Sequence, residues 1–120
     1  MRKPRTTTPP PHSGKRLAVI TRLWRGWTAT ANADAYEQFL LSELFPSMRS
    51  IPGFRGADVL RRLESDEVAF VTLTRFDSLD DIRKFAGEDY EVPVLEPRAL
   101  ALLSHYDARA LHFDSASFTM

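Results

Sequence analysis

The sequence predicts an α+β domain in which two helices cover one face of a four-stranded antiparallel sheet. Segments rich in β-branched and aromatic residues alternate with segments whose apolar residues recur every three to four positions, in the order β-α-β-β-α-β. Ser65 and Asp66 make a short connection between the second strand and the stretch that begins at Glu67, which predicts an antiparallel hairpin. The length of 120 residues is that of one domain.

The first strand is expected over residues 17–27, with apolar side chains at both odd and even positions. A strand with one face in water would alternate instead. Asn32 is a suitable N-cap for a helix that runs to about Ser50. Apolar residues recur in this helix at every fourth position, at Tyr36, Leu40, Leu44 and Met48. Pro46 lacks a backbone N–H and should kink or end the regular part of the helix.

The hairpin strands are expected over residues 54–64 and 68–76, and the second of them leads directly into a helix. Ser78 and Asp81 have the spacing of a capping box, in which each side chain accepts a hydrogen bond from the backbone N–H of the other. Gly87 can adopt a positive φ and end this helix. We therefore predict a strand that turns at once into a helix lying back over the sheet.

The last third of the chain predicts a loop, a short helix and a final strand. Residues 88–96 form an acidic loop, and Pro97 is well placed at the first position of a short helix. The final strand is expected over residues 105–113. The whole domain then spans residues 17–114, between a flexible, basic, proline-rich tail (1–16) and a frayed C-terminus (115–120).

This order of elements is the ferredoxin-like split βαβ arrangement, whose helices cover only one face of the sheet. The third strand nevertheless has apolar residues at both parities: Val68, Phe70 and Phe76 at one, and Ala69, Val71 and Leu73 at the other. A second copy of the same sheet would cover the other face. We therefore expect a homodimer whose two sheets pack face to face.

Charge and composition limit the classes of partner. Residues 1–16 hold five of the 16 basic residues and no acid, so the rest of the chain has a net charge of −5. A negatively charged body argues against nucleic acid as a partner. No run of about 18 apolar residues exists, so no membrane partner is expected. The absence of cysteine excludes disulfides and thiolate ligands, and it fits a reducing cytoplasm.

Four blocks of sequence, LAVITRLWRGWT, IPGFRGADVLRR, FVTLTRFDSLDDIRKFAGED and LSHYD, together resemble the antibiotic biosynthesis monooxygenase-like family of dimeric α/β-barrel proteins. The resemblance covers residues 17–113. It implies a cavity between sheet and helices, which in characterised relatives holds an aromatic polyketide, a quinol or haem. It further implies a monooxygenase, an oxidoreductase that needs no metal or flavin cofactor, because the anion of a small aromatic, phenolic or quinol substrate itself donates electrons to molecular oxygen.

Such chemistry requires an apolar pocket, a proton acceptor and a cation that stabilises the substrate anion. Trp24 is a candidate aromatic wall, unless it only fills the core or the dimer interface. Arg22 and Arg75 stand among apolar strand positions, so each is either a member of an interface ion pair or an anion binder. His105 and Tyr106 are the neighbouring pair that could transfer a proton near neutral pH, unless His105 is purely structural.

The sequence is also compatible with two other functions. The fold could hold an apolar ligand without turnover, as a binding or stress-associated module, or it could handle haem. The haem-degrading relatives carry the iron ligand on a helix, whereas His12, His105 and His112 all lie outside the two long predicted helices. His105 and His112 are seven residues apart on a predicted strand, so they should face opposite sides and cannot share one ion. No metal-binding motif is present.

Overall fold

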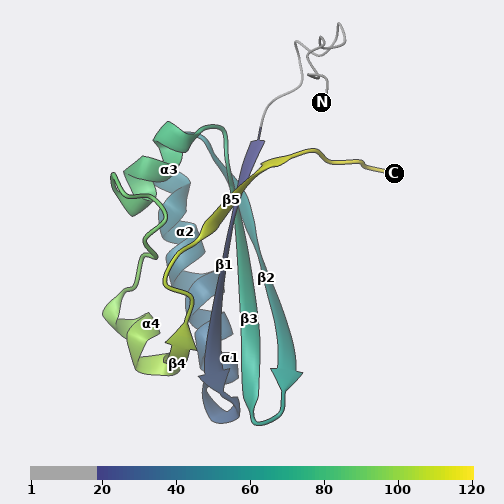
Figure 1. The fold of residues 1–120 in the computed structure, drawn as a ribbon, viewed down its shortest axis with the longest axis vertical. Helices are drawn as coiled ribbons and strands as arrows, with labels where there is room; N and C mark the ends of the chain where they lie inside the picture. Colours follow the sequence, from purple (N-terminus) through teal and green to yellow (C-terminus); the bar gives the residue numbers. More distant parts are fainter. Residues whose placement is uncertain (1–18) are drawn as a thin grey trace, which may run out of the picture.

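The computed structural model describes residues 19–120 and has the predicted α+β, ferredoxin-like architecture (Figure 1). The predicted tail (1–16) and the first two residues of the predicted first strand lie outside the described residues. The sheet is open and antiparallel, and its strand order is β2-β3-β1-β4, with β5 also paired to β1. Its strands are β1 (Val19–Ala29), β2 (Phe54–Glu64), β3 (Glu67–Phe76), β4 (Leu103–Tyr106) and β5 (Leu111–Ser115).

The helices lie together on one face of the sheet (Figure 1). A first run joins five short segments: η2 (Thr30–Asn32), α1 (Ala33–Phe39), η3 (Leu40–Leu44), α2 (Phe45–Ser47) and η4 (Met48–Ser50). The later helices are α3 (Leu79–Ala86) and α4 (Pro97–Leu102). Among the described residues, no helix is both long enough and apolar enough to cross a membrane.

Pro46 disturbs the first helical run, as the sequence predicts. Because Pro46 has no N–H to donate, the preceding segment η3 is π-helical, and the Phe45 N–H reaches back five residues to the Leu40 carbonyl. The regular α-helix therefore ends at Phe39, but the chain stays helical to Ser50. Asn32 precedes α1 without a side-chain cap, and its Nδ2 donates instead to the Leu102 carbonyl of α4 at 3.4 Å.

The joint between β3 and α3 forms at the predicted residues. The Asp81 N–H donates to Ser78 Oγ at 3.1 Å, which caps the first turn of α3. The Asp81 carboxylate accepts from the Ser78 hydroxyl at 2.9 Å, in place of the backbone N–H that a full capping box would use. Gly87 ends the helix with a φ of +94°, in the region that favours glycine.

The single final strand predicted over residues 105–113 is wrong, because two strands separated by Asp107–Ala110 replace it. Two contacts fix the first and last residues of this interruption. The Asp107 carbonyl accepts from Trp24 Nε1 at 2.8 Å, and the Ala110 N–H donates to the Glu91 carbonyl at 2.7 Å. Both β4 and β5 pair with β1, at different points along its length.

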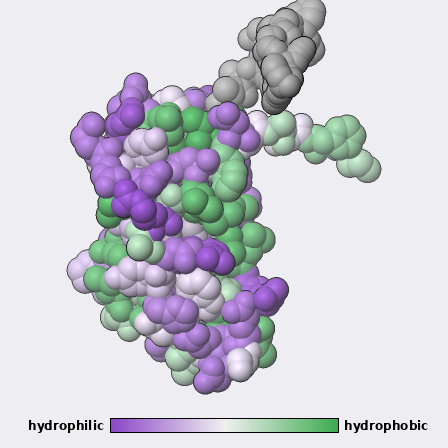
Figure 2. Space-filling view, in the orientation of Figure 1, coloured by the Kyte–Doolittle hydropathy of each residue, from purple (hydrophilic) through white to green (hydrophobic). Residues whose placement is uncertain are grey.

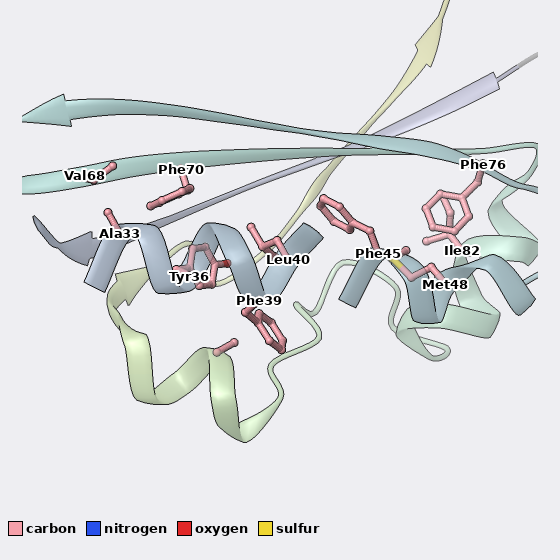
Figure 3. Packing of buried hydrophobic residues seen from close by; sticks show 11 residues of the cluster. Ala33, Tyr36, Phe39, Leu40, Phe45, Met48, Val68, Phe70, Phe76 and Ile82 are labelled. Carbon is pink, nitrogen blue, oxygen red and sulfur yellow. The ribbon is translucent and has the colours of Figure 1, made fainter. Parts of the chain in front are cut away.

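The core fills the space between the sheet and the helices (Figure 3). Even-numbered positions of β1 and β3 face this core, and Phe76 and Ile82 are completely buried in it. The other face of the sheet, which we call the open face, is covered by no helix or strand of residues 19–120. It exposes Leu60, Leu111 and Phe113 by about half. In Figure 2 apolar residues form a band along the strand side of the body, beneath the C-terminal segment.

Candidate functional site

A cavity of about 40 Å³ lies between the sheet and the helices. Its wall is mostly apolar and comes from β1, β3, the first helical run, α3, α4 and the loop at residues 88–96 that connects α3 to α4 (Figure 1). We call residues 88–96 the cavity loop. Since one water needs about 10–15 Å³ of such space, the cavity holds roughly three waters. A ligand with several rings therefore requires the wall to move outward.

Arg22 supplies the positive charge in this wall, and only 4% of it is exposed. Its Nη1 donates to the Tyr90 carbonyl and to His112 Nε2 at 3.0 Å, and its Nη2 donates to the Val92 carbonyl at 3.1 Å. Within residues 19–120 no carboxylate lies within ion-pair distance of this guanidinium. Burial lowers the pKa of Arg22 to about 10, so the group remains a cation at neutral pH.

Arg22 also has hydrogen-bonding capacity left. A guanidinium carries five N–H groups, and the three described hydrogen bonds occupy three of them. The remaining two are available to a ligand oxygen, and guanidinium N–H groups are well suited to anionic oxygens. The arrangement is that of an anion-binding residue at the side of an apolar cavity.

Trp24 and Tyr36 provide aromatic surface in the same wall. Trp24 is fixed by the hydrogen bond from its Nε1 to Asp107, so its ring orientation is set by the sheet and not by the cavity contents. Tyr36 packs edge-on against Phe70, with ring centroids 4.9 Å apart. Burial raises the pKa of the Tyr36 phenol, which therefore stays protonated and can donate a hydrogen bond. From the sequence, Tyr36 is recognisable only as part of the apolar stripe of the first helix.

The structure separates the other predicted site residues. Arg75 lies on the open face and forms an ion pair with Asp58 at 2.7 Å. His105 also lies on the open face, opposite Trp27 in the register of β1 and β4, and its ring stacks on that indole at 4.5 Å. Tyr106 points to the cavity side, where its ring lies 5.8 Å from that of Trp24 without lining the cavity. Arg22 and Trp24 are thus the two predicted residues that meet in the cavity wall.

His112 and Tyr90 are the residues near Arg22 that the sequence analysis missed. His112 is the direct cross-strand partner of Arg22 on β5, and its ring packs edge-on against Tyr90 at 5.0 Å. His105 and His112 face opposite sides of the sheet, although they lie on two strands and not on the single strand from which this was predicted. No sequence signal identified the contact with Arg22, because it depends on where the final strand is interrupted.

Metal and haem binding would each require suitably placed ligand side chains. Across residues 19–120, no three histidine, cysteine, aspartate or glutamate side chains gather closely enough to hold a metal ion. The helical segments of the structure contain no histidine that could serve as an axial haem ligand. The residues of the cavity wall therefore do not fit haem held in the manner of the haem-degrading relatives.

No protein-family model matches the sequence, and no curated protein matches it. Solved structures do match. SnoaB, a cofactor-independent oxygenase from Streptomyces nogalater, is 20% identical with a TM-score of 0.52, over 84% of this chain and 96% of its own. The monooxygenase from the gene ActVA-Orf6 of Streptomyces coelicolor, in complex with nanaomycin D, is 15% identical with a TM-score of 0.53, over 88% and 94%.

A third similar structure is the haem degrader MhuD from Mycobacterium tuberculosis, which is 15% identical with a TM-score of 0.53, over 84% of this chain and 99% of its own. These likenesses span most of the chain and agree with the resemblance read from the sequence. The chain therefore has the ferredoxin-like fold of the antibiotic biosynthesis monooxygenase proteins.

Proposed function

We propose that the cavity binds a small phenolic or quinol-type aromatic compound as its anion and promotes oxidation of that compound by molecular oxygen. The observation that supports this is Arg22, a buried cation whose described partners are all neutral. A buried charge is unfavourable unless it is compensated. An anionic ligand in the cavity would supply the missing compensation.

Each residue of the wall has a role in this proposal. Arg22 stabilises the phenolate or enolate, the electron-rich form that reacts with oxygen. Trp24 supplies a flat surface for the aromatic rings, and Tyr36 donates a hydrogen bond from its neutral phenol. The transfer of the substrate proton by His105 and Tyr106 stays a prediction. Of the two, Tyr106 is on the cavity side and His105 is not.

The reaction balances without a cofactor when the substrate is a phenol with an adjacent benzylic methylene. The methylene and one O₂ give a ketone and one water. One oxygen atom enters the product and the other leaves as water, while the substrate supplies all four electrons. The contribution of the protein is limited to holding the anion, positioning its rings and excluding bulk water.

The test is oxygen uptake with 1,8-dihydroxyanthrone as the probe, corrected for its spontaneous oxidation, together with ¹⁸O₂ labelling of the product. We expect Arg22→Met to lower the rate by about 10²-fold, the usual effect of removing one stabilising donor. The matched control is Arg75→Met, which removes an arginine from the opposite face and should leave the rate unchanged. Equal rates for wild type and Arg22→Met would refute the assignment of Arg22.

A binding function without turnover is the second candidate. It is favoured by the position of His105 outside the cavity, which leaves the described wall without a histidine to accept the substrate proton. A phenolic ligand that binds to wild type in an Arg22-dependent way and is recovered unchanged under air would support it. Haem handling would require a Soret band on titration with haemin.

The proposal includes a homodimer in the cytoplasm. Leu23, Val71 and Leu73 lie side by side on the open face, where a second sheet could cover them. The ion pairs Arg75–Asp58 and Arg25–Asp107 lie within one chain, so the charged groups near these apolar residues are already partnered before association. Burial of apolar area would therefore drive association without leaving these charges buried and unpaired.

A further inference from the structure

His112 is the one described hydrogen-bond partner of Arg22 that does not belong to the cavity loop. It lies directly opposite Arg22 on the paired strand β5, and its Nε2 is 3.0 Å from Arg22 Nη1. An arginine can only donate hydrogen bonds, so Nε2 must accept. The imidazole in this contact is therefore neutral and carries its proton on Nδ1.

The other partners of Arg22 belong to the segment that must move. The carbonyls of Tyr90 and Val92 are in the cavity loop, and residues 93–96 of the same loop form part of the cavity wall. A three-ring ligand cannot enter about 40 Å³ unless this wall moves outward. Outward movement of the loop would take both carbonyls away from Arg22, whereas His112 is held by the sheet.

We propose that His112 is a positioning residue for Arg22. Its neutral imidazole keeps the guanidinium beside the cavity when an entering anion replaces the carbonyls of the cavity loop. This inference rests on the proposed function of the cavity, and it adds a residue that touches the cation without touching the ligand. Protonation of His112 is then expected to release the Arg22 guanidinium from its position beside the cavity.

The groups around His112 support this dependence on protonation. Arg22 faces it from β1, Tyr90 and Glu91 from the cavity loop, and Asp114 is on its own strand. Arg83 of α3 stacks over Tyr90. Burial lowers the pKa of His112, and the charge of Arg22 lowers it further, against an opposing effect of Glu91. Protonation would remove the acceptor and place two cations in contact.

The experiment measures binding of 2-hydroxy-1,4-naphthoquinone, an acidic quinone that remains an anion in weak acid, with 1,4-naphthoquinone as the neutral comparison. We expect wild type to bind the anion about tenfold more weakly at about pH 4.5 than at about pH 7.5, because the lowered pKa of His112 puts its protonation below the ordinary histidine value of about 6.5. His112→Gln retains an acceptor that does not titrate. It should keep the affinity of wild type at the higher pH and show little change at the lower one.

Two further variants separate positioning from folding. His112→Leu should bind the anion about tenfold more weakly at both pH values. His12→Gln replaces a histidine of the N-terminal tail that has no role in the proposed site, and it should behave as wild type. Thermal unfolding of each variant identifies any that do not fold, and His112→Gln then carries the test. Equal affinities of wild type and His112→Leu, or tighter binding of the anion by wild type in acid, would overturn the inference.

Failure of this inference can be distinguished from failure of the proposed function. If Arg22→Met abolishes binding of the anion but the His112 variants bind as wild type, the cavity is supported as the binding site and the positioning role of His112 is refuted. If wild type does not bind the anion at either pH, both fall. Oxygen uptake with the anthrone reports on the proposed function independently of this titration.

Discussion

Burial distinguishes two arginines that look alike in the sequence. Arg22 and Arg75 both stand among apolar strand positions, but only Arg75 has a carboxylate partner, Asp58. Burial lowers the pKa of Arg22 to about 10, because it disfavours the charged form of the guanidinium. A base whose pKa is lower in the folded state binds its proton less tightly than in the unfolded chain, so the charge of Arg22 reduces stability below about pH 10. A buried charge that lowers the stability of the folded state is a candidate for a functional role.

Gly53 illustrates a steric requirement at the same scale. Its φ is +88°, and a Cβ there would lie 2.0 Å from Asp81 Oδ2. Gly87 also has a positive φ, but a Cβ there would meet no atom within 4 Å. We expect Gly87→Ala to lower the free energy of unfolding by about 1–3 kcal/mol through backbone strain alone. Gly53→Ala should lower it by a further 1–3 kcal/mol or so through overlap with Asp81.

Urea unfolding of the two alanine variants measures this difference. The pair is matched, because both substitutions add one methyl group at a glycine with positive φ. A loss of stability in Gly87→Ala as large as that in Gly53→Ala would show that the contact with Asp81 relaxes without cost.

At the scale of elements, local signals were sufficient wherever the determinants are close in sequence. The β2–β3 hairpin and the joint from β3 to α3 form where the sequence predicts, because a two-residue connection and the Ser78 cap act over a few residues. The assignment of Arg22 and Trp24 to one face also followed from strand parity.

The prediction of a single final strand was wrong for the opposite reason. Its interruption depends on Trp24 and Glu91, which contact Asp107 and Ala110 from distant parts of the chain. No local pattern encodes such contacts. The position of His112 beside Arg22 and the separation of His105 from the cavity depend on the same register, so these parts of the candidate site could not be predicted.

The cap of α3 gives a test at the scale of elements. Ser78→Ala removes the oxygen that accepts from the Asp81 N–H, and we expect the free energy of unfolding to fall by about 1 kcal/mol. Ser42→Ala is the matched control, because Ser42 is an exposed serine within the first helical run and caps nothing. It should change stability by less than about 0.5 kcal/mol. Equal effects in chemical denaturation would argue that the cap contributes little.

At the scale of the whole molecule, one face of the sheet is covered by helices and the other is not. The covered face contains the core and the cavity, whereas the open face leaves several large apolar side chains partly exposed. Parity in β1 and β3 predicts both faces from the sequence, since apolar residues occupy odd and even positions alike. Within residues 19–120, helices cover only one of these two apolar faces.

The proposed homodimer follows from this asymmetry and can be tested at Leu23. This residue lies between Leu73 of β3 and Leu111 of β5 on the open face. A carboxylate there would lose its hydration on association, so Leu23→Glu should sediment as a monomer while wild type sediments at twice the chain mass of 13.7 kDa. Leu41→Glu, at a half-exposed leucine in the first helical run, should remain dimeric. Wild type that sediments as a monomer at micromolar concentration would exclude the dimer, and the apolar open face would then require another partner.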